Sequence, residues 1–248
     1  MRDKILPMSM PLIIKSPTEL TQDIRIRGAT WENSTVSMLA YEEASRVTHS
    51  ARFYSSPVTM DKDMITRVEE ARGDSEPGVG KNWQAWFRNV PPDAGLRVED
   101  EYSIRVIKGD ALWQCRKGDD RAMTETLQGN PPSCGAADWL IEAPRVIGAL
   151  ILTDISEVSF LGRSALSVLG SLRTDLGFVA GSRVMSDRIV LSALTPGGDA
   201  YSFCIDGDLG ILLRLEVRLY GRAFMVYEVK ELELGMGLFN ELFRTPLD

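Results

Sequence analysis

Residues 200–232 read AYSFCIDGDLGILLRLEVRLYGRAFMVYEVKEL, and this stretch decides the expected fold of the C-terminal half. Ile211–Leu219 and Ala223–Leu232 both alternate between apolar and charged side chains, which is the period-two pattern of half-buried strands. Ala200–Ile205 precedes them, and Asp206-Gly207-Asp208 supplies a turn between strands. The stretch therefore predicts an antiparallel meander.

The segments before this meander predict a further strand, a buried strand and a helix. Arg183–Leu194 is expected as a strand, and the apolar run Val146–Leu152 is typical of a strand buried on both faces. Residues 156–176 are expected to form a helix that packs on the sheet and ends at Gly177. Its apolar stripe comprises Val158, Leu161, Ala165, Leu166, Val168, Leu169 and Leu172, of which the four leucines are expected to be buried.

The N-terminal half shows weaker patterns, and a loop over residues 73–95 interrupts them. Its expected elements are a strand beginning at Ile24-Arg25-Ile26, a helix over Thr59–Arg72, strands over Leu96–Ile107 and Ala111–Arg116 joined by a turn at Lys108-Gly109-Asp110, a short helix over Asp119–Gln128 and, at the end of the chain, a short helix over Leu238–Phe243. Together the two halves predict an α+β fold, with a largely antiparallel sheet, a few packed helices and a strand-rich C-terminal half.

The predicted domain organisation is a single globular domain over residues 21–248, preceded by an extended arm over residues 1–20. Pro7, Pro11 and Pro17 bias the arm toward extended backbone. A sub-boundary is expected near 129–135, where Gly and Pro residues interrupt the apolar patterns.

Composition and charge exclude several classes of protein. The chain has 248 residues, of which 44% are hydrophobic and 25% charged, as in ordinary globular proteins. Its net charge of −7 and the lack of a strongly basic block argue against nucleic acid as a partner. Its longest apolar run falls far short of the roughly 20 residues that span a bilayer, so no transmembrane segment is expected.

The cysteine content predicts a reducing compartment. Cys115, Cys134 and Cys204 are few, odd in number and widely spaced, which favours free thiols over a disulfide framework. We therefore expect a cytoplasmic protein, located in the host cytoplasm or the virion if its source is viral.

Metal and cofactor chemistry finds little support. Asp199, Asp206 and Asp208 crowd two neighbouring turns, where carboxylates could bind Ca²⁺ or Mg²⁺, but Asp-Gly is also ordinary hairpin chemistry. His49 is the only histidine, which argues against a zinc centre. We expect no metal and no cofactor, with these three aspartates as the strongest candidates if a metal binds.

Three large aromatic residues lie close together in the loop-like region, at Trp83, Trp86 and Phe87. Such a cluster can anchor a loop to the core, or it can form an interface hot spot, where Trp is enriched. These residues are therefore the candidate interaction site for another protein.

Residues 205–230 resemble the late strands of rhabdovirus matrix proteins, with an acidic turn, an alternating strand, a glycine and another strand. The proline-rich late-domain motif and the basic N-terminal region of those proteins are missing. The resemblance therefore implies no residue roles.

The function predicted from these features is that of a non-enzymatic structural or assembly protein that self-associates, of the coat, matrix or scaffold type. It rests on the lack of a catalytic constellation, on the N-terminal arm and on strand edges that could pair. The alternatives are an enzyme that uses Asp and Glu for acid/base or metal-assisted chemistry, and a small regulatory domain that binds a protein through the Trp83 region.

Overall fold

The structure is a computed structural model that describes residues 22–33, 35–39, 66–67, 70, 80–88, 95–108, 111–118, 122–126, 143–172 and 198–245. Its elements in chain order are β1 (Ile24–Glu32), β2 (Lys81–Arg88), β3 (Gly95–Asp100), β4 (Ser103–Lys108), β5 (Ala111–Arg116), β6 (Ala122–Thr126), helix α4 (Ala143–Gly148), β7 (Leu150–Phe160), β8 (Arg163–Leu172), β9 (Ala200–Asp206), β10 (Leu212–Leu219), β11 (Arg222–Leu234) and the 3-10 helix η2 (Asn240–Phe243).

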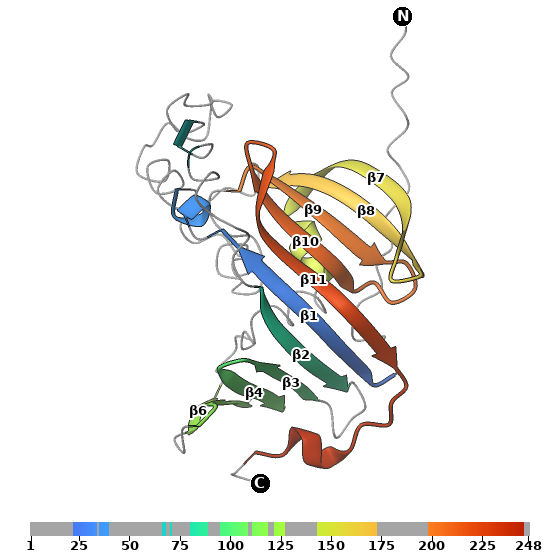
Figure 1. Cartoon of the computed structure of the whole chain (residues 1–248). Helices are drawn as coiled ribbons and strands as arrows, with labels where there is room; N and C mark the ends of the chain where they lie inside the picture. Colours follow the sequence, from blue (N-terminus) through green and yellow to red (C-terminus); the bar gives the residue numbers. More distant parts are fainter. Residues whose placement is uncertain are drawn as a thin grey trace, which may run out of the picture.

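The strands form one eleven-stranded antiparallel sheet in the order β6-β5-β4-β3-β2-β1-β11-β10-β9-β8-β7 (Figure 1). Strands that follow one another along the chain pair side by side in two meanders, β1–β6 and β7–β11. The first strand then pairs with the last, which joins the two meanders into a single sheet.

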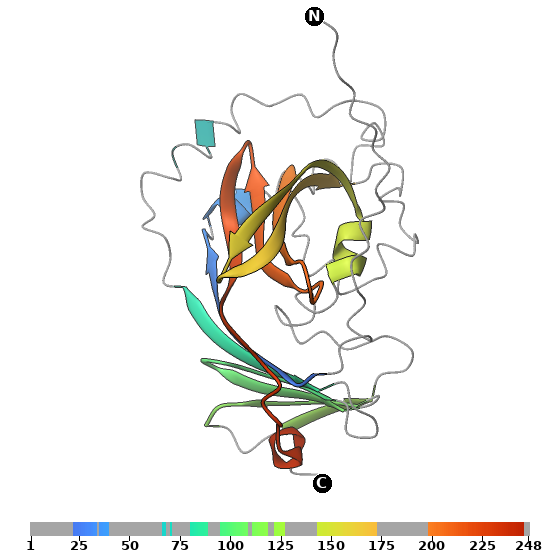
Figure 2. The same ribbon diagram turned by 90° about the vertical axis from the view of Figure 1, so that its right-hand side faces the viewer.

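The sheet is curved, and strands β7–β11 wrap around α4 (Figure 2). We call the face toward α4 the inner face and the opposite one the outer face. Bulges add a residue to one strand of a pair and increase its bend and twist. Register shifts of this kind lie at Arg27/Gly28, Leu152/Asp154, Leu212/Arg214 and Val217/Arg218.

The prediction of an α+β fold is wrong, because one antiparallel sheet makes up almost all of the described structure. Residues 156–176, predicted as a packed helix, contain most of the hairpin β7–β8 instead. Leu161 and Gly162 form its turn with φ values of 53° and 72°, the left-handed backbone that two-residue hairpin turns require. The leucines at helical spacing led to the prediction of a helix, because a short apolar stripe is compatible with either a helix or a pair of strands.

Other local predictions differ for similar reasons. The apolar run Val146–Leu152 begins in α4 and enters β7 only at Leu150, and a short apolar run cannot by itself distinguish a buried helix from a buried strand. Asp119–Gln128 contains strand β6 rather than a helix, because pairing with β5 outweighs the local helical pattern. The expected strand Leu96–Ile107 turns at 101–102 to form β3 and β4, and the expected loop 73–95 contains β2.

The expected strands β5, β9, β10 and β11 are confirmed, and η2 lies within the predicted Leu238–Phe243 helix. The predicted arm 1–20, the sub-boundary 129–135 and the strand Arg183–Leu194 lie outside the described residues. Of the predicted helix Thr59–Arg72, only residues 66, 67 and 70 are described, and they are helical.

The C-terminal segment, residues 235–244, packs on the outer face of the N-terminal meander. Arg88 donates from Nε and Nη2 to the two carboxylate oxygens of Asp23, each at 3.1 Å, and Asp23 Oδ2 also accepts the backbone N–H of Leu238 at 2.6 Å. Leu238 and Phe243 then cover Val106 and Trp113 in a small apolar cluster. Charge-assisted bonds of this kind hold the segment at its start.

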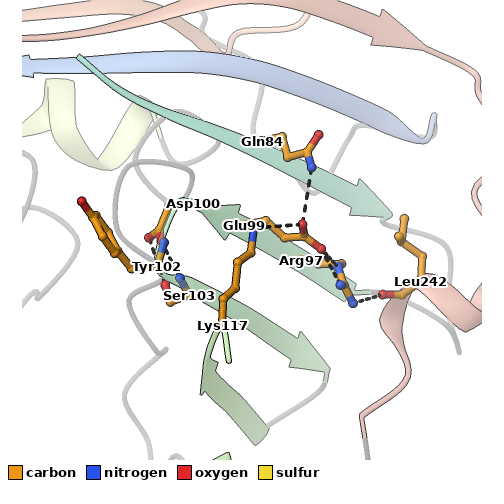
Figure 3. Close-up of polar contacts among 8 residues, drawn as sticks. All are labelled: Gln84, Arg97, Glu99, Asp100, Tyr102, Ser103, Lys117 and Leu242. Atoms are coloured by element: carbon orange, nitrogen blue, oxygen red, sulfur yellow. Dashed lines mark hydrogen bonds and ion pairs between the residues drawn. The ribbon is translucent and has the colours of Figure 1, made fainter. Parts of the chain in front are cut away.

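A second polar network fixes the end of this segment (Figure 3). Glu99 accepts hydrogen bonds from Arg97 and Gln84 and pairs with Lys117 at 3.8 Å, so its carboxylate links neighbouring strands of the sheet. Arg97 also donates from Nη1 to the carbonyl oxygen of Leu242 at 3.0 Å. The network therefore ties the C-terminal segment to the middle of β3.

The β7–β8 turn can be tested by substituting its two residues. We expect Leu161→Asn to raise the free energy of unfolding by roughly 0.5–1 kcal/mol, because Asn tolerates positive φ better than Leu. Gly162→Ala should lower it by about 1 kcal/mol through backbone strain, since a Cβ there meets no atom within 4 Å. Urea unfolding measures both values, and a helix at this position would reverse both signs.

Two adjacent residues of β8 distinguish its buried face from its exposed face. Leu169 is 36% exposed on the outer face, whereas Val168 is 1% exposed on the inner face. We therefore expect Leu169→Ala to cost less than about 1 kcal/mol and Val168→Ala to cost about 2 kcal/mol. Equal losses in thermal or urea unfolding would contradict the strand assignment.

Candidate binding surface on the inner face of the sheet

The inner face carries a row of directly opposed apolar side chains across the N-terminal meander. Alternation along each strand places every second residue on this face, and the strand registers bring those residues opposite one another. From β11 to β5 the row comprises Leu234, Ile24, Phe87, Leu96, Ile107 and Leu112.

A second apolar row crosses the C-terminal meander on the same face. From β11 to β7 it comprises Tyr227, Leu215, Phe203, Val168 and Ile155. Its inner members are buried, but Ile155 on the edge strand is 48% exposed. The row therefore ends in solvent at the margin of the sheet.

Trp83 lies between the two rows, over Gly28 of the neighbouring strand, which is itself paired with Val229. A Cβ at Gly28 would lie 2.1 Å from Cζ2 of the Trp83 ring, so only glycine leaves room for the indole. The indole N–H donates to Thr30 Oγ1 at 3.1 Å, which satisfies its one polar group. Burial raises the pKa of the Tyr201 and Tyr227 hydroxyls well above the ordinary value, so this part of the face carries no tyrosinate charge.

The described cover of the inner face is small. α4 contributes the buried Val146 and Ile147, and Val36 and Leu39 of the helical residues 35–39 are buried in the same core cluster. A six-residue helix is about 9 Å long, whereas eleven strands spaced by about 4.8 Å extend over several tens of ångströms. In the described part of the chain, the apolar face is therefore much larger than the helices that pack on it.

The inner face becomes polar at one end of β4 and β5, beyond Ile107 and Leu112. Arg105 stands opposite Val98 and Gln114, and its Nη2 lies 3.6 Å from Asp100 Oδ2. Partial burial acts to raise the pKa of Asp100, but hydrogen bonds from the N–H groups of Tyr102 and Ser103 hold it below the ordinary value (Figure 3). This end can meet a polar or charged group while the rest of the face meets an apolar one.

The outer face of the C-terminal meander differs sharply, because ion pairs occupy it. Glu216 pairs with Arg214 and Arg218, and Arg214 also lies 3.7 Å from Glu228. These pairs are partly buried, and they give the outer face a charged lining instead of an apolar one. The continuous apolar surface is therefore on the inner side, where most of its residues are buried.

The three predicted metal ligands do not come together in one site. Asp206 is fully buried, accepts Arg163 through both oxygens and caps the N–H groups of Asp208 and Leu209 at 3.0 and 2.8 Å. Burial opposes ionisation of Asp206, but these partners keep its pKa below the ordinary value. Asp208 is exposed and lies 3.5 Å from Arg163.

Asp199 lies at the other end of β9 from these two residues and accepts the N–H of Tyr220 at 2.6 Å. Burial raises its pKa above the ordinary value. All three aspartates thus act in turns, and within the described ranges no three His, Cys, Asp or Glu side chains gather into a potential metal site.

The predicted aromatic cluster is divided between the two faces of β2. Trp83 and Phe87 lie on the inner face, while Trp86 lies on the outer face with the cluster around Leu238 and stacks against the Arg97 guanidinium. The residues belong to a strand rather than a loop, and their role in binding another protein stays a prediction.

The remaining reactive candidates are placed as follows. Cys204 is buried in β9, and burial raises the pKa of its thiol. His49 and Cys134 lie outside the described residues. No helix among the described residues is both long and apolar enough to span a membrane.

Sequence reasoning missed the inner face as a surface. Its signal was present in the alternation of β9, β10 and β11, which places Phe203, Leu215 and Tyr227 on this face. The pairing of β1 with β11, which makes the two rows continuous, carried no signal in the sequence.

Comparison with known proteins found no matching family model and no matching curated protein. Solved structures match at low identity, among them an uncharacterized conserved protein from Thermus thermophilus (12% identity, TM-score 0.44, 92% of this chain and 88% of that chain). MucB from Pseudomonas aeruginosa, solved as a MucA/MucB complex, matches at 11% identity and TM-score 0.42, over 93% of this chain and 58% of that chain. A LolA superfamily protein from Nitrosomonas europaea matches at 8% identity and TM-score 0.32, over 92% of both chains.

These matches correct three predictions. They are bacterial proteins, and none is named as a coat, matrix or scaffold subunit, so the predicted self-assembling structural protein of viral type is wrong. The predicted cytoplasmic or virion location and the viral source are wrong for the same reason. Cysteine content, on which the location was predicted, does not by itself fix a compartment.

Proposed function

We propose that the protein is a binding protein that holds a long apolar chain, of the acyl type, against the inner face of its sheet. The observation that carries this proposal is the pair of apolar rows, which both include a residue of β11 and together cross ten of the eleven strands. Burying a chain along such a surface contributes about 0.8 kcal/mol per methylene group.

The two ends of the surface suit an amphiphile. At the β7 end of the surface, the second row ends at the half-exposed Ile155. An apolar chain can reach the inner face from solvent at this point. At the other end Arg105, Gln114 and Ser103 replace apolar residues on the same face. A ligand with an apolar chain and a polar head matches this change from apolar to polar lining.

To bind on the inner face, the ligand must lie beside helix α4 or displace it. Val146 and Ile147 of α4 are side chains of a short helix that contacts β7, and such a helix depends on tertiary packing for its stability. An acyl chain that replaces this helix exchanges one apolar contact for another. The sheet itself need not change.

Displacement of the fluorescent apolar probe 1-N-phenylnaphthylamine by saturated fatty acids tests the proposal on the whole chain. We expect the competing affinity to rise steeply from octanoate to palmitate, by up to about fourfold per methylene group, because each added group leaves water. No probe binding, or affinity independent of chain length, would overturn the proposal.

Two variants of the same strand locate the site. Ile155→Asp places a charge at the end of the second apolar row and should weaken probe binding about fivefold or more. Val158→Asp makes the same change on the outer face, at a residue that is 38% exposed, and should leave binding unchanged. Equal effects of the two substitutions would place the ligand elsewhere.

A further inference from the structure

β7 is the outermost strand on one side of the sheet, and its free edge is open over most of its length. The strand has eleven residues, and among the described residues only β8 pairs with it. Residues 153–159 are all exposed. In an antiparallel strand the backbone groups of every second residue point away from the existing partner, so this edge presents unpaired N–H and C=O groups.

The edge lacks most of the features that block pairing with another chain. β7 contains no Lys, Arg or Pro, and its one bulge lies near its start, between Leu152 and Asp154. The stretch Asp154–Phe160 is therefore regular over about 20 Å. The opposite edge of the sheet is β6, which has only five residues.

Both faces of this edge carry one carboxylate and one exposed apolar side chain. The register with β8 places Ile155 and Glu157 on the inner face, opposite Val168 and Leu166. Asp154 and Val158 lie on the outer face, opposite Leu169 and Ala165. A strand added here would therefore have one carboxylate and one apolar side chain of β7 beside it on each face.

The charges decide what kind of strand fits. Two copies of β7 paired edge to edge would bring four carboxylates together with no basic residue from either strand. Like charges on neighbouring strands destabilise their pairing, and the chain as a whole carries a net charge of −7. A second copy of this chain is therefore disfavoured, and a basic segment is favoured.

We propose that the open edge of β7 binds an extended, basic segment of another protein, which adds to the sheet as a twelfth strand. Main-chain hydrogen bonds supply general affinity in this mode, and alternate side chains supply specificity. This site shares Ile155 with the inner face, but its main-chain hydrogen bonds and its carboxylates play no part in holding the acyl ligand.

The register gives the pattern that such a segment should carry. In an antiparallel partner, apolar residues stand opposite Val158 and Ile155, and basic residues stand opposite Glu157 and Asp154. Read along the partner, the order is apolar, basic, any residue, apolar, basic. The heptapeptide Thr-Val-Lys-Thr-Ile-Arg-Thr, blocked at both ends, contains this pattern.

Fluorescence anisotropy of the labelled heptapeptide with the full chain tests the proposal. We expect saturable binding that weakens at least tenfold between 0.05 and 0.5 M NaCl, because the ion pairs are exposed and screened. The same peptide with Glu in place of Lys and Arg should not bind. Equal binding of the two peptides, or binding of neither, would overturn the proposal.

Charge reversal separates the edge from the general acidity of the protein. Asp154→Lys with Glu157→Lys should weaken the basic peptide at least tenfold and allow the acidic peptide to bind. The matched control Glu101→Lys with Glu241→Lys makes the same change in net charge at two exposed residues away from β7 and should leave the preference as it was.

Circular dichroism and thermal unfolding establish that both double variants are folded. Unchanged preference in the β7 variant, or the same switch in the control, would overturn the proposal. Sedimentation of the unmodified protein addresses the other occupant: a dimer that the β7 substitutions dissociate would show that a second copy of this chain fills the edge, and would also overturn it.

Discussion

The pairing of β1 with β11 is the constraint on which the rest of the structure depends. It joins residues about 200 positions apart in the chain, so its formation carries the entropic cost of closing a very long loop. Cross-strand ion pairs between Arg25 and Glu233 and between Arg27 and Glu231 lie along the joint. Just beyond it, Asp23 binds both Arg88 and the backbone of Leu238, which fixes the start of the C-terminal segment. Without this joint the chain would hold two smaller sheets, each with an additional free edge.

The joint also creates the proposed binding surface. The bulge beside Gly28 keeps Val229 and Tyr227 on the same face as Leu232 and Leu234, so the apolar rows of the two meanders become neighbours. Trp83 fills the space that the missing side chain of Gly28 leaves, and its indole N–H is satisfied by Thr30. A glycine, a bulge and one large ring therefore turn two half-buried sheets into one continuous apolar face.

The remaining surfaces follow from how each strand meets water. On the outer face, ion pairs cover β10 and β11, while the C-terminal segment covers the apolar residues of the N-terminal meander. Among the described residues, neither an ion pair nor a covering segment lies at the β7 edge, and the strand keeps exposed apolar and acidic side chains together. The inner face suits an apolar ligand, and the edge suits a basic strand, because burial dominates one surface and backbone pairing with charge dominates the other.

Local pattern determined the strands of the 200–234 meander, since alternation and turn chemistry act between residues close in the chain. The same information failed for β7–β8: Tyr220-Gly221 and Leu161-Gly162 form similar turns with positive φ, but leucines at helical spacing obscured the second one. Trp83, Trp86 and Phe87 could be recognised as important, yet only β2 and its neighbours decide that they lie on opposite faces. The turn role of Asp206 was readable from Asp-Gly, whereas its burial against Arg163 was not. Short-range periodicity can be read from the sequence alone. The joining of β1 to β11, and with it the continuous inner face, depends on contacts between distant residues, which exist only in the folded sheet.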